Sequence, residues 1–204
     1  MAGSLILGVF LLPAWAILVV EIILAVLIVY TLSFFRDPYR IPPFDKKNIL
    51  SPADGKITDI ESVKENNFIG GPSIKFGIFL SIFNAHINRA PCDVKVQKII
   101  YKKGKYLNAA NPQSGQVNES NNLNLIRTEN PKDKLVVRQI SGAIARRIVC
   151  DVTEEQVLKR GEKFGMIKFG SRTEIYLTAQ NNIKLLVKKG DKVKAGLTTL
   201  ARYE

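Results

Sequence analysis

Histidine and cysteine are scarce in this 204-residue chain, which contains one histidine, His86, and two cysteines, Cys92 and Cys150. Two cysteines cannot build the disulfide framework of a small secreted protein. Together with one histidine they fall short of the four ligands of a structural zinc site, so we predict no metal site. We expect both thiols to be ordinary buried side chains.

Basic residues are absent from the N-terminal part: residues 1–35 contain no lysine or arginine and one acidic residue, Glu21. Residues 36–204 carry 30 basic and 17 acidic side chains, so the rest of the chain is strongly basic. Zinc fingers, arginine-rich helices and aromatic RNA-binding motifs are missing, which argues against nucleic acid as a partner. The surface of an anionic membrane accounts better for this charge.

The uncharged N-terminal part has the length of a membrane anchor. Residues 5–35 are almost all apolar, and as one helix they would extend about 45 Å, beyond the roughly 30 Å of a hydrocarbon core. We expect Pro13 to divide this run into a spanning helix over 14–35 and a short piece over 5–12, which either spans or lies in the interface. The run is too long, and lacks the basic start, for a secretory signal peptide.

Basic residues follow the apolar run directly and none precede it. Arg36, Arg40, Lys46 and Lys47 all lie within a dozen residues of its end. Because positively charged flanks stay on the cytoplasmic side, this asymmetry predicts a protein of the cell membrane with its basic domain in the cytoplasm.

The rest of the chain has the pattern of a β protein. We predict a membrane anchor over 1–35, a proline-rich linker over 36–50 and a β-rich domain over 51–204. One short helix is expected, over Thr153–Leu158, and Asn108–Asn122 is expected to be an exposed loop. The expected strands cover residues 56–63, 74–83, 94–101, 123–127, 134–140, 143–149, 174–177, 183–188 and 197–203.

Two segments at opposite ends of this domain look like halves of one substructure. Residues 51–60 and 186–201 each place a glycine-containing turn before a short alternating strand. They are similar to the paired strands of lipoyl-type barrel-sandwich domains. We therefore expect a mainly β fold of the barrel-sandwich-hybrid type with an N-terminal transmembrane helix. Ordinary Gly-Asp turns in another all-β fold remain the alternative.

Four stretches suggest a function when they are taken together. They are FFRDPYRIPP (34–43), SPADG (51–55), FLSIFNAHINRAP (79–91) and GEKFGMIKFGSRTEIYL (161–177). In their order and spacing they resemble the short prokaryotic branch of the phosphatidylserine decarboxylase family, whose members are pyruvoyl-dependent membrane enzymes. The resemblance extends from Phe34 to the end of the chain.

The resemblance implies that the bond between Gly170 and Ser171 cleaves itself. The Ser171 hydroxyl would attack the preceding carbonyl, and elimination and hydrolysis would leave fragments 1–170 and 171–204, the second beginning with a pyruvoyl group. This covalent cofactor would condense with the amine of a serine phospholipid and accept the electrons released as CO₂ leaves, which converts phosphatidylserine to phosphatidylethanolamine. Diacyl lipid and archaeal diether lipid (archaetidylserine) are equally compatible with this chemistry.

The resemblance also implies roles for other residues. His86 matches a histidine that handles the substrate carboxylate and a proton, and Asp54 matches the aspartate of a catalytic triad. Longer members have a second histidine three residues after the first, where this chain has Arg89. Arginine cannot normally act as a base, so the base for self-cleavage stays open. Arg89 is instead expected to bind the lipid phosphate or the serine carboxylate.

Arg36 and Arg40 are expected to contact the lipid headgroup just outside the membrane, and positive-inside anchoring explains them equally well. The two fragments would stay together as a heterodimer, which leaves a higher homo-oligomer open.

Two other functions fit parts of the sequence. A membrane-tethered lipoyl-like domain that acts as a non-enzymatic adaptor would stay a single intact chain. A pseudo-decarboxylase would cleave itself without turning over lipid, and Arg89 in place of a histidine keeps that hypothesis open.

Overall fold

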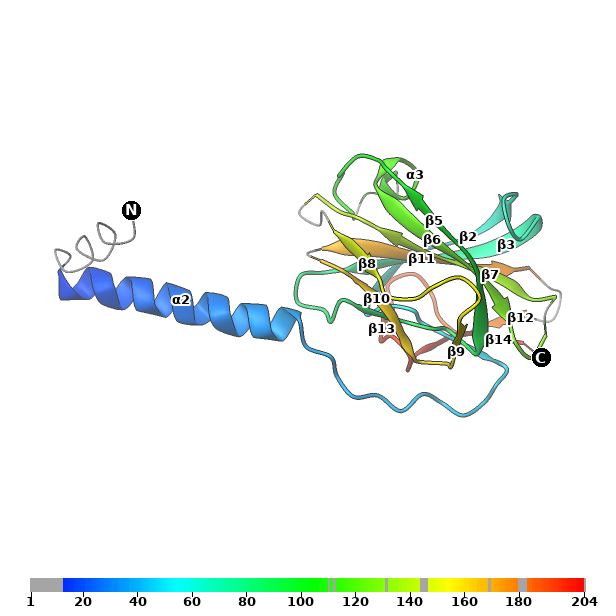
Figure 1. The fold of residues 1–204 in the computed structure, drawn as a ribbon, viewed down its shortest axis with the longest axis horizontal. Helices are drawn as coiled ribbons and strands as arrows, with labels where there is room; N and C mark the ends of the chain where they lie inside the picture. The colour runs from blue at the N-terminus through cyan, green and yellow to red at the C-terminus, as the bar shows by residue number, and fades with distance from the viewer. Residues whose placement is uncertain are drawn as a thin grey trace. The chain divides into compact units, whose positions relative to one another are not determined.

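In the computed structural model the contacts divide the chain into two units, Met1–Arg36 and Asp37–Glu204. Figure 1 shows the helix and the strands of the described residues. The structure describes residues 13–109, 111, 113–130, 132–143, 147–168, 170–179 and 183–203. The elements are α2 (Ala14–Phe34), β1 (Asn48–Leu50), β2 (Gly55–Glu65), β3 (Gly71–Leu80), β4 (Ile87–Arg89), β5 (Val94–Lys102), α3 (Ser114–Val117), β6 (Ser120–Arg127), β7 (Lys134–Ile140), β8 (Ile148–Cys150), β9 (Val157–Leu158), β10 (Lys163–Ile167), β11 (Ser171–Thr178), β12 (Ile183–Leu185), β13 (Lys192–Val193) and β14 (Thr199–Tyr203).

Helix α2 begins directly after Pro13, whose extended backbone places it at the N-cap. Its 21 residues extend about 32 Å. Within the described part of the chain it is the one helix long and apolar enough to cross a membrane. The helix predicted over 14–35 is therefore confirmed to within one residue, whereas its crossing of a membrane stays a prediction. The predicted short piece over 5–12 lies outside the described residues.

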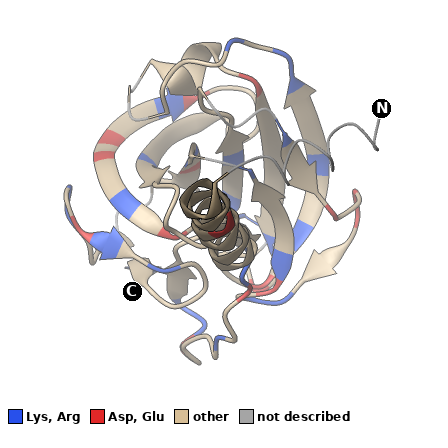
Figure 2. Ribbon diagram, turned by 90° about the vertical axis from the view of Figure 1, so that its left-hand side faces the viewer, with Lys and Arg blue, Asp and Glu red and all other residues tan. Residues whose placement is uncertain are grey.

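The second unit is mainly β, as predicted. Its largest sheet is antiparallel and has the strand order β13-β2-β3-β11-β7-β6-β5-β9, which places β11 between β3 and β7 near its centre. Two three-stranded sheets, β1-β14-β12 and β4-β10-β8, complete the described strands. Seen from one end, the strands of the largest sheet curl around (Figure 2).

The predicted meeting of the two ends of this unit is confirmed. Gly55 and Lys56 of β2 pair with Val193 and Lys192 of β13, and β1 pairs with β14. These ladders join segments about 140 residues apart in sequence. Aliphatic side chains from both ends, including Ile57 and Leu200, enter one buried core, which holds the termini of the unit together.

The predicted helix over Thr153–Leu158 is wrong. Val157 and Leu158 form β9, which pairs with the start of β5. Glu155 has a positive φ of 70°, a conformation that a helix cannot contain, and its N–H donates to the carbonyl of Val96. A charged and polar run here makes a turn against β5, because backbone pairing outweighs a weak helical propensity.

The predicted exposed loop over Asn108–Asn122 is wrong in its second half. It contains α3 and the start of β6, and Asn118 is buried. The Asn118 side chain donates to the carbonyls of Leu107 and Ser141 and accepts from the N–H of Leu107. An asparagine that satisfies backbone groups in this way looks like a loop residue in sequence.

Several predicted strands have different bounds, β3 and β8 among them. β3 ends at Leu80, three residues before the predicted end at 83, because residues 81–84 form a turn in which the Asn84 side chain accepts from the N–H and hydroxyl of Ser81. β8 covers Ile148–Cys150, so only the end of the strand predicted over 143–149 is present among the described residues.

The register of the largest sheet places the ends of several strands side by side, at one end of the sheet. Ser171, at the start of β11, lies opposite Leu80, at the end of β3, and Arg172 lies opposite Ile140, at the end of β7. Ser120, at the start of β6, lies between Ile140 and the end of β5. Four connections therefore meet at this end of the sheet: those after β3, β5 and β7 and the one before β11. We call this end the active edge.

Candidate active site

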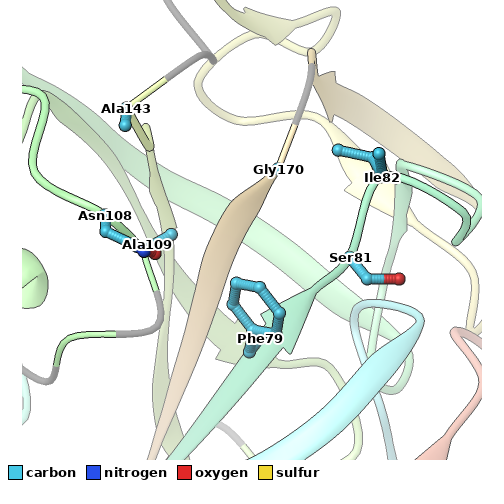
Figure 3. A pocket seen from close by; sticks show the side chains of 7 residues that line it. All are labelled: Phe79, Ser81, Ile82, Asn108, Ala109, Ala143 and Gly170. Atoms are coloured by element: carbon cyan, nitrogen blue, oxygen red, sulfur yellow. The ribbon is translucent and has the colours of Figure 1, made fainter.

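A cavity of about 260 Å³ lies at the active edge. Each of the four connections contributes to it, and Figure 3 shows Gly170 between side chains from the other three. Most of the contributed side chains are small or apolar, so a bound molecule would be largely shielded from water. The lining residues are Phe79, Ser81, Ile82, Asn108, Ala109, Ala143 and Gly170.

Ser171 follows Gly170 and is fully buried. Its hydroxyl oxygen has no hydrogen-bond partner among the described residues. A buried hydroxyl without a partner costs about 1–3 kcal/mol, so its retention points to a chemical role. The sheet holds the residue in place, since β11 is paired on both sides from Arg172 onward.

Gly170 has a φ of +62°, a left-handed conformation that favours glycine. Its carbonyl lies against Gly142: a Cβ added to Gly142 would be 2.2 Å from the Gly170 oxygen and 3.2 Å from the Gly170 carbonyl carbon. The absence of a side chain at 142 therefore allows this carbonyl its position. The preceding residue, Ser141, carries a second buried hydroxyl without a partner in the described structure.

His86 is fully buried and contacts the same segment. Its Nε2 accepts a hydrogen bond from the N–H of Gly170 at 3.3 Å, and its Nδ1 lies 2.9 Å from the carbonyl oxygen of Asn84. The carbonyl can only accept, so Nδ1 carries the proton and Nε2 presents a lone pair. The structure thus brings together His86, Gly170 and Ser171, three of the residues singled out in the sequence.

A buried ionic cluster anchors β11 directly after Ser171. The Arg172 guanidinium is fully buried and donates to both oxygens of Asp59, at 2.6 and 2.9 Å, and to Glu174 at 2.9 Å. Burial alone would raise the pKa of Asp59, but the hydrogen bonds and charge of Arg172 lower it below its ordinary value. Alternation along β11 places this cluster on one face of the strand and Ser171 on the other.

Comparison with known proteins bears on this arrangement. The family model for phosphatidylserine decarboxylase matches residues 28–201. The chain is 43% identical over 178 residues to a phosphatidylserine decarboxylase proenzyme of Carboxydothermus hydrogenoformans, which covers 87% of this chain and 82% of the relative. This chain belongs to the phosphatidylserine decarboxylase family. Proenzymes of the same description in Syntrophus aciditrophicus and Prosthecochloris aestuarii are 45% and 41% identical over 85% and 94% of the chain, and over 80% and 86% of their own lengths.

Proenzymes of this family generate a pyruvoyl group from one of their own serines. The geometry at Ser171 fits such a group. The hydroxyl is unpartnered, the preceding carbonyl belongs to a glycine in a left-handed conformation, and a cavity opens beside it. The family expected from the sequence is confirmed, and the non-enzymatic adaptor is set aside, because the chain matches an enzyme family along most of its length.

Asp54, which the resemblance matches to the aspartate of a catalytic triad, contacts Arg40 and Ala195 in the structure. Its carboxylate accepts two hydrogen bonds from Arg40, at 2.5 and 2.7 Å, and one from the N–H of Ala195 at 2.8 Å. Arg40 also donates to the carbonyl of Ala195. Both side chains are nearly buried, so this pair fastens the linker and the C-terminal segment to the SPADG turn.

Arg89 is also engaged within the linker region. Its guanidinium donates to the carboxylate of Asp37 at 2.6 Å and to the carbonyls of Gly161 and Pro38. Burial lowers the pKa of Arg89 relative to its ordinary value. In the helical unit, Arg36 donates to the carbonyl and hydroxyl of Ser33. Binding of the lipid headgroup by Arg89, Arg36 and Arg40 stays a prediction.

Sequence reasoning missed two participants at this edge, Gly142 and Arg172. A glycine in a polar SGA sequence gives no sign that it contacts a carbonyl far along the chain. The alternation Arg172-Thr173-Glu174 within a strand was a usable signal, because it places two opposite charges on one face. Cys92 is buried as expected, and burial raises the pKa of its thiol to about 12. Cys150, which was also expected to be buried, is partly exposed at the end of β8.

Proposed function

We propose that Ser171 is the serine from which this proenzyme makes its pyruvoyl group, and that the bond between Gly170 and Ser171 is the one it cleaves. As a member of the family, the chain is a phosphatidylserine decarboxylase, a carboxy-lyase that processes itself and then decarboxylates phosphatidylserine. The observation that carries the assignment is the buried Ser171 hydroxyl, without a partner among the described residues, directly after a left-handed glycine that lines the cavity.

Self-cleavage follows from the placement of these groups. The Ser171 oxygen adds to the carbonyl carbon of Gly170, the C–N bond breaks, and the acyl group moves from nitrogen to oxygen as an ester. Loss of the Cα proton of residue 171 then expels the Gly170 carboxylate. The remaining enamine takes up water and releases ammonia, which leaves the ketone. The left-handed conformation of Gly170 and the close approach of its carbonyl to Gly142 support this assignment, because both fix where the carbonyl lies.

His86 is proposed as the proton-transfer group of this edge. Its Nε2 accepts a hydrogen bond from the N–H of Gly170, one residue before the new terminus, and we propose that it exchanges this bond for the Ser171 hydroxyl when it takes up the proton. The bond of Nδ1 to Asn84 holds the ring in this tautomer. Arg89 cannot supply this function, since its guanidinium is bound to Asp37 and Gly161.

In the mature enzyme the pyruvoyl group supplies an electrophilic carbonyl that accepts the electron pair released from the serine carboxylate. The chain's own residues position and shield this reaction. Apolar lining residues such as Phe79 and Ile82 keep water from the cavity, and His86 lies where it can return a proton to the product.

The two fragments are proposed to remain one body after cleavage. Fragment 171–204 contains β11, which pairs with β3 and β7, and β13 and β14, which pair with β2 and β1. All of these partners belong to fragment 1–170. Cleavage removes one covalent bond and leaves these ladders intact, so we propose a tight heterodimer of the fragments. We further propose that helix α2 anchors it in the membrane and that the β unit lies in the cytoplasm, which the basic residues after the helix support.

The test is processing of the full-length chain. Wild-type protein should give two bands on a denaturing gel, and intact-mass spectrometry should find a 171–204 fragment that starts with a pyruvoyl group. Ser171→Ala should give one uncleaved chain and no CO₂ from phosphatidylserine. Ser73→Ala, which removes another buried hydroxyl at the opposite end of β3, is the control and should process normally. Cleavage at another bond, or normal processing of Ser171→Ala, would refute the assignment.

A further inference from the structure

The exposed residues around the cavity have a composition unlike that of a soluble enzyme's rim. Phe83, directly after the lining residue Ile82, is 73% exposed, and Tyr106 and Leu107, directly before the lining residue Asn108, are 41% and 37% exposed. Three lysines, Lys102, Lys103 and Lys105, lie beside them at the end of β5 and in the following connection, and all are exposed. We call these six residues the rim.

Negative charge is nearly missing from the same edge. The connections over 81–86, 103–119, 141–147 and 168–170 contain several basic residues, Arg147 and Lys168 among them, and one acidic residue, Glu119. Glu119 is buried and accepts a hydrogen bond from the Tyr101 hydroxyl, so its carboxylate is not presented on the exposed surface. Strand β2, by contrast, carries basic and acidic residues together.

Exposed aromatic and aliphatic side chains next to lysines are the combination that binds a bilayer surface. Apolar side chains enter the headgroup layer, while each lysine near an anionic surface strengthens binding by about fivefold. A protein partner would fit less well, because interface cores are depleted in lysine. The cavity adds an independent reason, since a phospholipid leaves its bilayer only at high cost and the membrane that supplies phosphatidylserine is itself anionic.

We propose that the rim docks the active edge directly onto an anionic phospholipid bilayer, so that the headgroup passes from the membrane into the cavity without crossing water. This inference rests on the proposed function, because it takes the cavity beside Ser171 as the catalytic site. Docking is a separate device from the anchor: α2 keeps the chain at the membrane, and the rim turns the cavity mouth toward it.

The first test measures depth in the membrane and needs no turnover. Phe83→Cys is labelled with an environment-sensitive fluorophore in a Cys150→Ala background, since Cys92 is buried. Asn66→Cys is the matched control, because it lies in the turn before β3, about 30 Å from the cavity end of that strand. The full-length chain is reconstituted into vesicles of phosphatidylcholine with or without phosphatidylglycerol.

With phosphatidylglycerol present, the probe at 83 should shift to the blue and be quenched by nitroxide-labelled acyl chains, while the probe at 66 stays in water. A probe at 83 that stays as solvated as the probe at 66 overturns the proposal. Because neither signal depends on decarboxylation, this result is independent of whether the function assigned to Ser171 is correct.

The second test compares two charge reversals of equal size. The rim variant carries three substitutions, Lys102→Glu, Lys103→Glu and Lys105→Glu. The control variant reverses three exposed lysines at the opposite end of the sheet, near the end of β2, after β6 and after β9: Lys64→Glu, Lys132→Glu and Lys159→Glu. The readout is the ratio of CO₂ release from vesicles to CO₂ release from a short-chain, water-soluble phosphatidylserine.

This ratio should fall about tenfold or more for the rim variant and stay near the wild-type value for the control variant. Equal losses in both variants would mean that only total charge matters and would overturn the proposal. Absence of CO₂ from the soluble substrate in the wild type would instead count against the proposed function, so the two failures are distinguishable.

Discussion

Substitution of Gly142 by alanine tests whether the position of the Gly170 carbonyl controls self-cleavage. The new Cβ would lie 2.2 Å from the Gly170 oxygen, whereas ordinary contacts begin at about 3.4 Å, so the carbonyl must move by roughly 1 Å. A misplacement of this size costs about 10²-fold in rate, which is close to 3 kcal/mol of activation free energy. We therefore expect Gly142→Ala to process about a hundredfold more slowly than the wild type.

The assay is a time course of the two bands on a denaturing gel, after synthesis of the full-length chain in the presence of vesicles. Gly71→Ala is the matched control, because a Cβ added there meets nothing within 4 Å. Circular dichroism and the melting temperature report whether each variant folds, since crowding in a packed region also costs about 1–3 kcal/mol of stability. A folded Gly142→Ala chain that processes as fast as Gly71→Ala would refute the reasoning.

Three further variants test the side chains around the site. Asp59→Asn should destabilise the fold by about 1–3 kcal/mol, because it removes one of the two carboxylates bound to the buried Arg172 and leaves Glu174 as the other, and urea unfolding measures this loss. Asp54→Asn and Arg40→Met should each lower the melting temperature, and the double variant should lower it by little more than either one, since the two side chains form one contact. His86→Gln keeps a side-chain acceptor but no proton-transfer group, so it should fold and process about 10²–10⁴-fold more slowly on a denaturing gel.

The Asp59 prediction has a pH dependence with a defined sign. The pKa of Asp59 is lowered in the folded chain, so its stabilising contribution is present above the ordinary carboxylate value of about 4 and is lost as the pH falls through the lower folded-state value. Asp59→Asn should remove this part of the acid-induced loss of stability. Glu61 also pairs with Lys75, a partner of Asp59, but its side chain is half exposed. Glu61→Gln should therefore change the acid-induced loss of stability little.

The strands of this protein could be read from the sequence because their residues alternate and their ends carry turn residues. Lys134–Ile140 was predicted with its observed bounds, and β2 and β5 to within two residues. The failures have a common cause. Thr153–Leu158 and Asn108–Asn122 take their structure from backbone groups of β5 and of residues near 141, which no local pattern reveals.

The residues of the candidate site likewise fall into two groups, those whose neighbours could be predicted from the sequence and those whose neighbours could not. Ser171, Gly170 and His86 lie in motifs and were identified with their neighbours, and the structure brings them together. Asp54 and Arg89 also lie in motifs, but their partners, Ala195 and Gly161, come from distant segments and could not be inferred. A motif identifies which residues matter in a family, whereas their contacts depend on the packing of segments far apart in sequence.

The position of Arg172 bears on how the proposed cleavage at Gly170–Ser171 would leave the active site in place. A new terminus normally frays, because nothing holds the first residues of a strand. Arg172, the second residue after the proposed break, carries a fully buried guanidinium that is bound to Asp59, which would belong to the other fragment. The ladders to β3 and β7 begin at the same point. Removing the ion pair should therefore loosen position 171 in the cleaved enzyme more than it slows cleavage, which a comparison of processing and CO₂ release in Asp59→Asn would reveal.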